Sequence, residues 1–326
     1  KKGGASMGFL WKKETLWFDE ELLEGMTLSL EVQEPQHILH KSDREPRAPQ
    51  EMHIFQNSIF GTVLVIDGVF QVASRFAYIY HEMLAHMPLI SYRNPYRVLV
   101  IGGGDGLILS EIVKHPSVQE IVMVEYDPNV VKFCKDYFPG SREAFENGKT
   151  EVIFGDGAVF AVEYAGNPFD VVIIDSSDAD DSNQKNINNS IFSDSFYGNL
   201  KTRCMHKDSL LIRQTGSYLL QPKVLPKTYL ALLGMFSYVR PVNMFSEPLY
   251  PPCFSLCMAW DSSEHIALAK QQIMNRYIER GLEPLTRYYS PDVHIASRIF
   301  PKEIADMLFE LKRKSGMEKV KHGSDL

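Results

Sequence analysis

The stretch VLVIGGGDG at residues 98–106 decides the fold class of this 326-residue chain. Its four apolar residues predict a buried strand, and the glycines and aspartate after them predict a tight turn into a helix over Gly106–Lys114. Further strand-like runs, separated by helix-like segments, stand at residues 121–124, 151–154 and 171–174. Strands that alternate with helices form a parallel sheet covered on both faces, so we expect an α/β fold.

The chain before this region has a different pattern. Residues 28–32 and 52–56 alternate between apolar and polar, and residues 62–66 end at the turn dipeptide Asp67-Gly68, as in an antiparallel hairpin. A helix over Phe76–Ile90 is expected next. We therefore predict a small N-terminal antiparallel β-domain followed by a Rossmann-like, methyltransferase-type α/β domain. The expected boundaries are a disordered or vector-derived lead at 1–16, the β-domain at 17–75, the Rossmann-like catalytic domain at 76–310 and a polar tail at 311–326.

Charge and composition argue against several classes of protein. The formal net charge is −7, so no global attraction to nucleic acid or to an anionic membrane surface is expected. There is no run of about 18 apolar residues of the kind that predicts a membrane helix. The four cysteines form no zinc-binding pattern and indicate reduced thiols inside a cell, so we expect a cytoplasmic protein without a metal.

Polar motifs follow four successive strands of the predicted sheet: Gly102–Gly106, Glu125–Asp127, Gly155–Gly157 and Asp175–Asp178. Ligands of open α/β sheets bind outside the carboxyl ends of the strands, so all four motifs are expected at one edge. Glycines there let the backbone approach a ligand at a helix N-terminus. Glu125 stands about twenty residues after the glycines, the spacing at which a carboxylate accepts hydrogen bonds from ribose hydroxyls, and Asp156 is a candidate acceptor for an adenine amino group. The structural alternative is a tight turn with acids that cap helices.

Asp105 discriminates between cofactors. A carboxylate at this position would repel the methionine carboxylate of S-adenosylmethionine and attract an ammonium. A decarboxylated cofactor keeps the ammonium and lacks the carboxylate, which argues against a methyltransferase. Asp175 and Asp178 suit an amine substrate, because an amine with an ordinary pKa of about 10 is protonated at neutral pH and needs a carboxylate to accept its proton. Capping of the following helix remains the alternative for Asp105.

Further stretches complete a recognisable set: Ile66–Gln71, Tyr80–Leu84, Tyr288-Tyr289 and Asp292–His294. With the motifs above they resemble the spermidine synthase family of polyamine aminopropyltransferases, and the resemblance runs from about Trp17 to Leu308. It implies transfer of the aminopropyl group of decarboxylated S-adenosylmethionine to a diamine, putrescine to spermidine, with release of methylthioadenosine. It also implies a small-molecule polyamine substrate, an S-adenosyl co-substrate in place of a prosthetic group, no metal, no nucleic-acid or membrane partner, and a homodimer or tetramer.

The resemblance implies a role for each site residue. Asp175 is the expected catalytic residue, which positions and deprotonates the attacking amine. Asp105 would hold the aminopropyl ammonium, Glu125 the ribose and Asp156 the adenine. The expected cofactor-binding residues are Gly102, Gly104, Asp105, Glu125, Asp156, Gly157, Gln71 and His81. The expected substrate-binding residues are Tyr80, Asp178, Gln214 and Tyr250.

The sequence also departs from the family pattern, mainly around the acceptor amine. Phe76 and Ala77 stand where the family has an Asp-Glu pair, and Gly216 stands where a Glu is usual. The segment Ala179–Ser190, at the position of the family's gate over the active site, is polar and longer. Fewer acids weaken the binding of a cation, and a loose gate excludes water poorly. Two interpretations stay open: an active aminopropyltransferase with this or another amine, or a catalytically weak or inactive homologue that acts as a scaffold or regulatory subunit.

Overall fold

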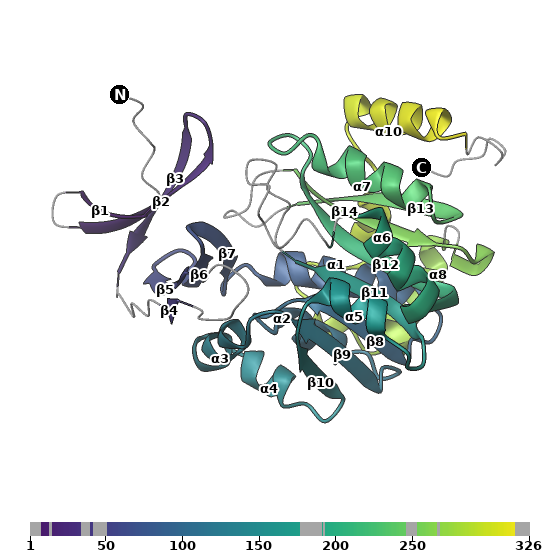
Figure 1. The fold of residues 1–326 in the computed structure, drawn as a ribbon, viewed down its shortest axis with the longest axis horizontal. Coiled ribbons are helices and arrows are strands. Elements are labelled where there is room, and N and C mark those ends of the chain that lie inside the picture. Colours follow the sequence, from purple (N-terminus) through teal and green to yellow (C-terminus); the bar gives the residue numbers. More distant parts are fainter. Residues whose placement is uncertain are drawn as a thin grey trace.

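The computed structural model describes residues 8–12, 15–33, 40–41, 51–176, 191, 193–245, 253–265 and 268–316. Its strands form two small antiparallel sheets, at the left of Figure 1, and one large sheet with helices on both faces, at the right. No helix within these residues is long and apolar enough to cross a membrane.

The two small sheets share one core. The first contains β1 (Gly8–Lys12), β2 (Thr15–Leu23) and β3 (Met26–Val32). The second contains β4 (His40–Lys41), β5 (Glu51–Asn57), β6 (Gly61–Ile66) and β7 (Val69–Ala73). Neighbouring strands are antiparallel in both sheets. Phe18 and Leu30 of the first sheet pack with Phe55 and Val63 of the second, so burial of their apolar faces joins the sheets.

Strands and a helix lie in the two terminal segments where we expected a lead and a tail. Strand β1 and the start of β2 lie within residues 1–16, where we expected a disordered lead, because a ladder from Gly8–Asp19 to Lys12–Thr15 pairs their backbone groups. Helix α10 (Lys302–Lys314) runs into the expected tail, since Leu311 packs against the large core. The division between the two domains near residue 75 remains a prediction.

The large sheet has the strand order β10-β9-β8-β11-β12-β14-β13. Its parallel strands are β10 (Thr150–Phe154), β9 (Glu120–Glu125), β8 (Arg97–Gly102), β11 (Phe169–Asp175) and β12 (Met205–Ser217). The antiparallel strands at the other edge are β14 (Phe254–Trp260) and β13 (Tyr238–Met244). Val98 and Val100 of β8 face one core and Leu99 and Ile101 the other, which explains the unbroken apolar run of the sequence. The expected fold class is confirmed.

Helices cover each face of this sheet. One face packs against α1 (Tyr78–Ser91), α2 (Leu107–Ile112), α4 (Ser141–Phe145), α8 (Lys270–Glu279) and α9 (Pro291–Ala296). The other packs against α5 (Gly157–Glu163), α6 (Asp194–Asn199), a π-helical turn at Leu200–Cys204, α7 (Val224–Leu233) and α10. Helix α3 (Pro128–Tyr137) packs against the second small sheet, and short 3₁₀ turns lie at Ser263–His265 and Glu283–Leu285.

The helices that flank the glycine-rich turn differ slightly from expectation. Helix α1 begins at Tyr78 and not at Phe76, because the backbone N–H of Phe76 and of Ala77 both donate to the Ala73 carbonyl in a preceding turn. Helix α2 is shorter than the expected span of 106–114. It begins after Gly106, whose φ of +76° lies outside the helical region.

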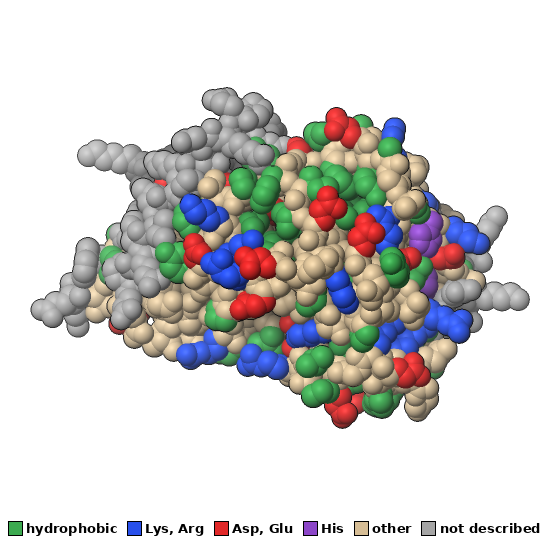
Figure 2. Space-filling view, turned by 90° about the horizontal axis from the view of Figure 1, so that it is seen from below, with side chains coloured by type: hydrophobic (Ala, Val, Ile, Leu, Met, Phe, Trp, Pro, Cys, Tyr) green, Lys and Arg blue, Asp and Glu red, His purple; other side chains and the backbone are tan. Residues whose placement is uncertain are grey.

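Charged side chains are mixed on the face of the molecule that Figure 2 shows. Lys and Arg side chains lie among Asp and Glu side chains over this face, with apolar side chains between them. This mixture is typical of an ordinary solvated surface.

Candidate active site

The chain order of the strands reverses between β8 and β11. Strands β9 and β10 are added on one side of β8, and β11 and β12 on the other. The carboxyl ends of the strands at such a reversal flank the crevice in which α/β proteins bind ligands. Asp105 follows β8 and Asp175 ends β11, so both lie at this point. Tyr80 and His81 reach it from the first turns of α1.

The glycine-rich turn brings the two strand ends together. The backbone N–H of Gly103 donates to the Asp175 carbonyl at 2.8 Å. A Cβ on Gly102 would lie 2.1 Å from the same carbonyl oxygen, so only glycine fits there. A Cβ on Gly104 would lie 2.8 Å from Oε2 of Glu125, so only glycine lets the turn approach that carboxylate this closely.

The two carboxylate oxygens of Asp105 have different roles, one in the fold and one in the site. Oδ1 accepts the backbone N–H of Leu107 at 2.8 Å, which is the capping role of the structural alternative. Oδ2 lies 3.3 Å from Nε2 of His81. The Ser141 hydroxyl donates to the Asp105 carbonyl at 2.6 Å and fixes its backbone. One oxygen therefore caps α2, while the other faces the site.

His81 is a buried cation between two carboxylates. Its Nδ1 lies 2.7 Å from the Ala77 carbonyl, which directs Nε2 toward Asp105. Burial disfavours the imidazolium, but the charges of Asp105 and Asp175 outweigh burial and raise the pKa of His81 to about 10. The site therefore combines two acids with one internal cation at neutral pH.

Asp175 has the position and the basicity of a proton acceptor. The Tyr80 hydroxyl donates to its Oδ1 at 2.7 Å, and the buried Tyr80 ring packs edge-on against Phe254. Burial raises the pKa of Asp175 to about 6, with the charge of His81 and the Tyr80 hydrogen bond opposing this rise and Asp105 adding to it. A carboxylate of this pKa is ionised at neutral pH and is a stronger base than an ordinary aspartate.

Glu125 and Asp156 end the two neighbouring strands. Glu125 is buried, and its Oε1 accepts the backbone N–H of Asp127 at 2.9 Å. Burial raises the pKa of Glu125 to about 7. The Asp156 carboxylate caps α5 by accepting the Ala158 backbone N–H at 2.8 Å, so the structural alternative is observed for this acid as well. At Gly157, a Cβ would lie 2.5 Å from the Ile101 side chain, which explains the close approach of α5 to β8.

The described site thus has acids at four adjacent strand ends, beneath a glycine-rich turn and beside a tyrosine and an imidazolium. A family model described as "Spermine/spermidine synthase domain" matches residues 77–270. The chain belongs to the spermine/spermidine synthase family. The polyamine aminopropyltransferase of Clostridium tetani is 33% identical over 295 residues, which cover 90% of this chain and 98% of that protein. The polyamine aminopropyltransferase of a Thermoanaerobacter species is 31% identical over 91% of this chain and 99% of its own length.

Solved structures of this family have the same fold. A spermidine synthase in complex with the transition-state analogue AdoDATO superposes with a TM-score of 0.81 at 25% identity, covering 95% of this chain and 99% of that one. The spermidine synthase of Thermotoga maritima gives 0.80 at 25% identity, covering 95% and 98%. The expected family and enzyme class, an aminopropyltransferase, are therefore confirmed.

The remaining predicted site residues differ in what the structure says of them. Gln71 lies on β7, and its Nε2 donates to the Val69 carbonyl at 3.2 Å. Gln214 lies on β12, where its Nε2 donates to the Ser176 carbonyl at 2.9 Å and its Oε1 accepts the Gly216 N–H at 2.8 Å. Its amide thus ties β12 to the end of β11. Asp178, Tyr250 and the segment 179–190 lie outside the described residues.

Two departures from the family pattern are core positions in this chain. The Phe76 ring packs edge-on against Phe60, with 5.9 Å between ring centroids, and Ala77 is buried. Apolar side chains at 76 and 77 therefore serve the junction between the small sheets and α1. Gly216 adopts a φ of +63° within the irregular end of β12, a conformation that a glutamate would rarely adopt.

Sequence reasoning missed two residues that organise the site. Ser141, at the start of α4, holds the Asp105 backbone, and its distance in sequence gave no signal of this contact. Glu82 belongs to a motif that carried the resemblance, but its hydrogen bonds to residues more than 200 positions away could not be read from the sequence.

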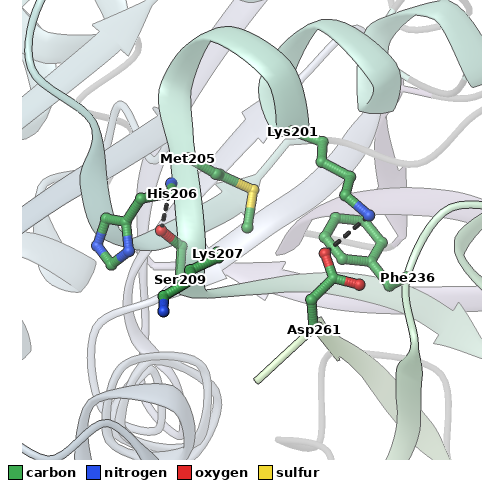
Figure 3. Close-up of a pocket in the computed structure, with 7 residues that line it drawn as sticks. All are labelled: Lys201, Met205, His206, Lys207, Ser209, Phe236 and Asp261. Atoms are coloured by element: carbon green, nitrogen blue, oxygen red, sulfur yellow. Dashed lines mark hydrogen bonds and ion pairs between the residues drawn. The ribbon is translucent and has the colours of Figure 1, made fainter. Parts of the chain in front are cut away.

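A cavity of about 220 Å³ lies at the opposite, amino edge of the parallel strands (Figure 3). Lys201 in its wall pairs with Asp261 at 2.7 Å, and His206 pairs with Asp170 at 3.1 Å. Lys201 and His206 are thus already paired with acids, and the cavity is remote from the carboxyl edge. Within the part of the chain that the structure describes, no three His, Cys, Asp or Glu side chains are grouped to hold a metal ion.

Proposed function

We propose that this protein transfers the aminopropyl group of decarboxylated S-adenosylmethionine to a diamine, converting putrescine to spermidine and releasing methylthioadenosine. The observation that carries the proposal is the arrangement of Asp105 and Asp175 around His81 at the strand reversal. It combines an acid for the donor's ammonium with a base for the acceptor amine.

Donor binding uses the acids at the strand ends. Asp105 binds the aminopropyl ammonium, Glu125 accepts from the ribose hydroxyls and Asp156 accepts from the adenine amino group. This assignment is supported by the close approach of the glycine-rich turn to Glu125 and by the side-chain oxygen of Asp105 that faces His81. The analogue complex of the similar spermidine synthase supports the choice of donor.

Asp175 accepts a proton from the attacking amine. The amine nitrogen forms a bond to the aminopropyl carbon next to the sulfonium, the C–S bond breaks, and sulfur leaves with the electron pair as a neutral thioether. One proton is lost from the amine, and Asp175, with a pKa raised to about 6, takes it. The Tyr80 hydroxyl fixes the orientation of this carboxylate.

A product assay tests the proposal. Purified protein is incubated with decarboxylated S-adenosylmethionine and with putrescine, cadaverine or spermidine, and methylthioadenosine is measured by chromatography. Release that depends on one amine identifies the acceptor. The matched variants are Asp175→Asn and Asp170→Asn, which change the two ends of strand β11. We expect turnover to be lost only in the first.

A second candidate is a homologue that binds the nucleoside but turns over weakly or not at all. It is supported by Gln214, whose amide is engaged by backbone groups on both sides, and by the apolar side chains at 76 and 77. Folded protein that binds methylthioadenosine but is silent with every amine would identify this candidate. The expected homodimer or tetramer and the cytoplasmic location remain predictions, and light scattering of the full chain measures the first.

A further inference from the structure

Helix α1 has a second face, remote from the catalytic groups. Tyr80 and His81 point toward Asp175 and Asp105. Tyr78, Glu82 and His86 are spaced four residues apart and form a stripe on the opposite side, about 150° around the axis at 3.6 residues per turn. All three contact residues 287–289, which we call the back strap.

Glu82 makes the central contact with the back strap. Its side chain is 1% exposed, and its carboxylate accepts three consecutive backbone N–H groups. Oε1 accepts from Arg287 at 2.8 Å, and Oε2 accepts from Tyr288 at 2.8 Å and from Tyr289 at 2.7 Å. Hydrogen bonds to a carboxylate are stronger than those between neutral groups, and a buried carboxylate is costly without them. Glu82 therefore fixes the distance between α1 and the back strap.

Two further contacts align the helix along the back strap. The guanidinium of Arg287 lies 3.8 Å from the centroid of the Tyr78 ring, one turn before Glu82. The Tyr289 ring lies 5.1 Å from the His86 ring, one turn after it. The helix is thus held over two turns. Residues 287–289 lie beyond the range 77–270 that the family model matches.

We propose that Glu82 is a positioning residue, which acts through the back strap to hold Tyr80 and His81 against the catalytic carboxylates. Tyr80 lies 2.7 Å from Asp175, and His81 lies 3.3 Å from Asp105. A displacement of α1 that lengthened each contact by about 1 Å would take both beyond hydrogen-bond range. Glu82 touches neither reactant. The expected effect of Glu82 on turnover rests on the proposed function, but its expected effect on the position of α1 does not.

The test compares Glu82→Gln with a matched variant. Glutamine keeps the size of the side chain but offers one acceptor oxygen and presents an NH₂ group to backbone donors. Asp170→Asn is the control, because Asp170 also accepts two consecutive backbone N–H groups, from Tyr96 at 2.7 Å and Arg97 at 2.9 Å. Asp170 is the second residue of β11, at the end of this strand that is far from Asp175.

The decisive readout is the titration of His81 by NMR in the full-length protein, with its signal assigned from the spectrum of His81→Gln. In the wild type we expect an apparent pKa near 10, because Asp105 and Asp175 face the ring. In Glu82→Gln we expect this pKa to fall by at least one unit, and kcat to fall at least tenfold with less than a threefold change in KM for the amine. In Asp170→Asn the pKa of His81 and kcat should stay at the wild-type level, although the melting temperature of this variant falls by about as much as that of Glu82→Gln.

An unchanged His81 titration in folded Glu82→Gln would overturn the proposal and leave Glu82 a purely structural residue. If Glu82→Gln does not fold, Glu82→Asp decides, since it keeps the carboxylate but shortens the side chain that accepts the three backbone N–H groups. A smaller fall in the pKa of His81 supports the proposal, and an unchanged pKa overturns it. The titration needs no turnover, so an inactive wild type would contradict the proposed function alone.

Discussion

Replacement of Asp175 by asparagine tests the chemistry most directly. Asparagine keeps the shape of the side chain and can still accept the Tyr80 hydroxyl, whose oxygen lies 2.7 Å from Oδ1 in the wild type. It cannot accept a proton from the amine. The acceptor must then arrive already neutral, and its supply is set by its own pKa.

The size of the loss follows from that supply. A primary alkylamine has a pKa of about 10.4, so about one molecule in 1,000 is neutral at pH 7.4. We therefore expect kcat/KM of Asp175→Asn to fall about 1,000-fold at pH 7.4, which lies within the usual range for loss of a general base. The wild type does not depend on this fraction, so the ratio of the two rates should shrink about tenfold with each unit of pH up to about 9.4.

The assay is methylthioadenosine release from pH 6 to 9.5, with Asp170→Asn as the control. In the wild type kcat/KM should rise as the pH passes through about 6, because the carboxyl of the free enzyme must be ionised to accept a proton. This rise of the rate near pH 6 should be absent from Asp175→Asn. A rate ratio that stays constant with pH, or a loss below about fivefold, would refute the assignment of Asp175 as the base.

Three further predictions concern the donor side. Burial raises the pKa of Glu125 from its ordinary value of 4.5 to about 7, so its contribution to stability is full below pH 4.5 and is lost as the pH rises through 7. The loss is on the order of 3 kcal/mol at 1.36 kcal/mol per unit, and urea unfolding at pH 5 and 8 should show a decline in stability that is smaller by about this amount in Glu125→Gln than in the wild type. Gly104→Ala should weaken methylthioadenosine binding at least tenfold in calorimetry, because its Cβ would lie 2.8 Å from Glu125, whereas Gly198→Ala, with open space around its Cβ, should bind normally. Binding of decarboxylated S-adenosylmethionine near pH 8 should release protons, because the donor's ammonium lowers the pKa of His81. Methylthioadenosine lacks that ammonium, so its binding should release none. Calorimetry in buffers of different ionisation enthalpy measures the number of protons released in each case.

Much of the fold was predictable because its signals are local. The apolar runs of β8, β9 and β11 are long enough to mark strands, and the glycines after β8 mark the turn where the sheet reverses. Acids at successive strand ends converge at one edge through the topology alone. This is why Asp105 and Asp175 could be placed at one site before any contact was known.

Other features depend on contacts between distant residues and gave no local signal. The strand at Gly8–Lys12 is stabilised by its ladder with β2, so composition alone suggested a disordered lead. Asp105 and Asp156 were each expected to bind ligand or to cap a helix, and both carboxylates do cap a helix. The contacts of Glu82 with residues 287–289 cross more than 200 positions of the sequence. The raised pKa of His81 depends on two carboxylates that are distant in the sequence, Asp105 in the turn after β8 and Asp175 at the end of β11.

The arrangement of charge around Asp175 links donor chemistry to proton transfer. A cation beside a carboxylate lowers its pKa, as His81 does for Asp175 in this site. A bound donor adds two more positive charges, an ammonium and a sulfonium, so Asp175 is a weaker base while the donor is intact. When the C–S bond breaks, sulfur becomes neutral and the attacking nitrogen takes over its positive charge. The step therefore moves one positive charge from sulfur to nitrogen without removing it, and Asp175 keeps a cation beside it throughout. The proton that Asp175 accepts is the one that the protonated acceptor must lose before its nitrogen can attack.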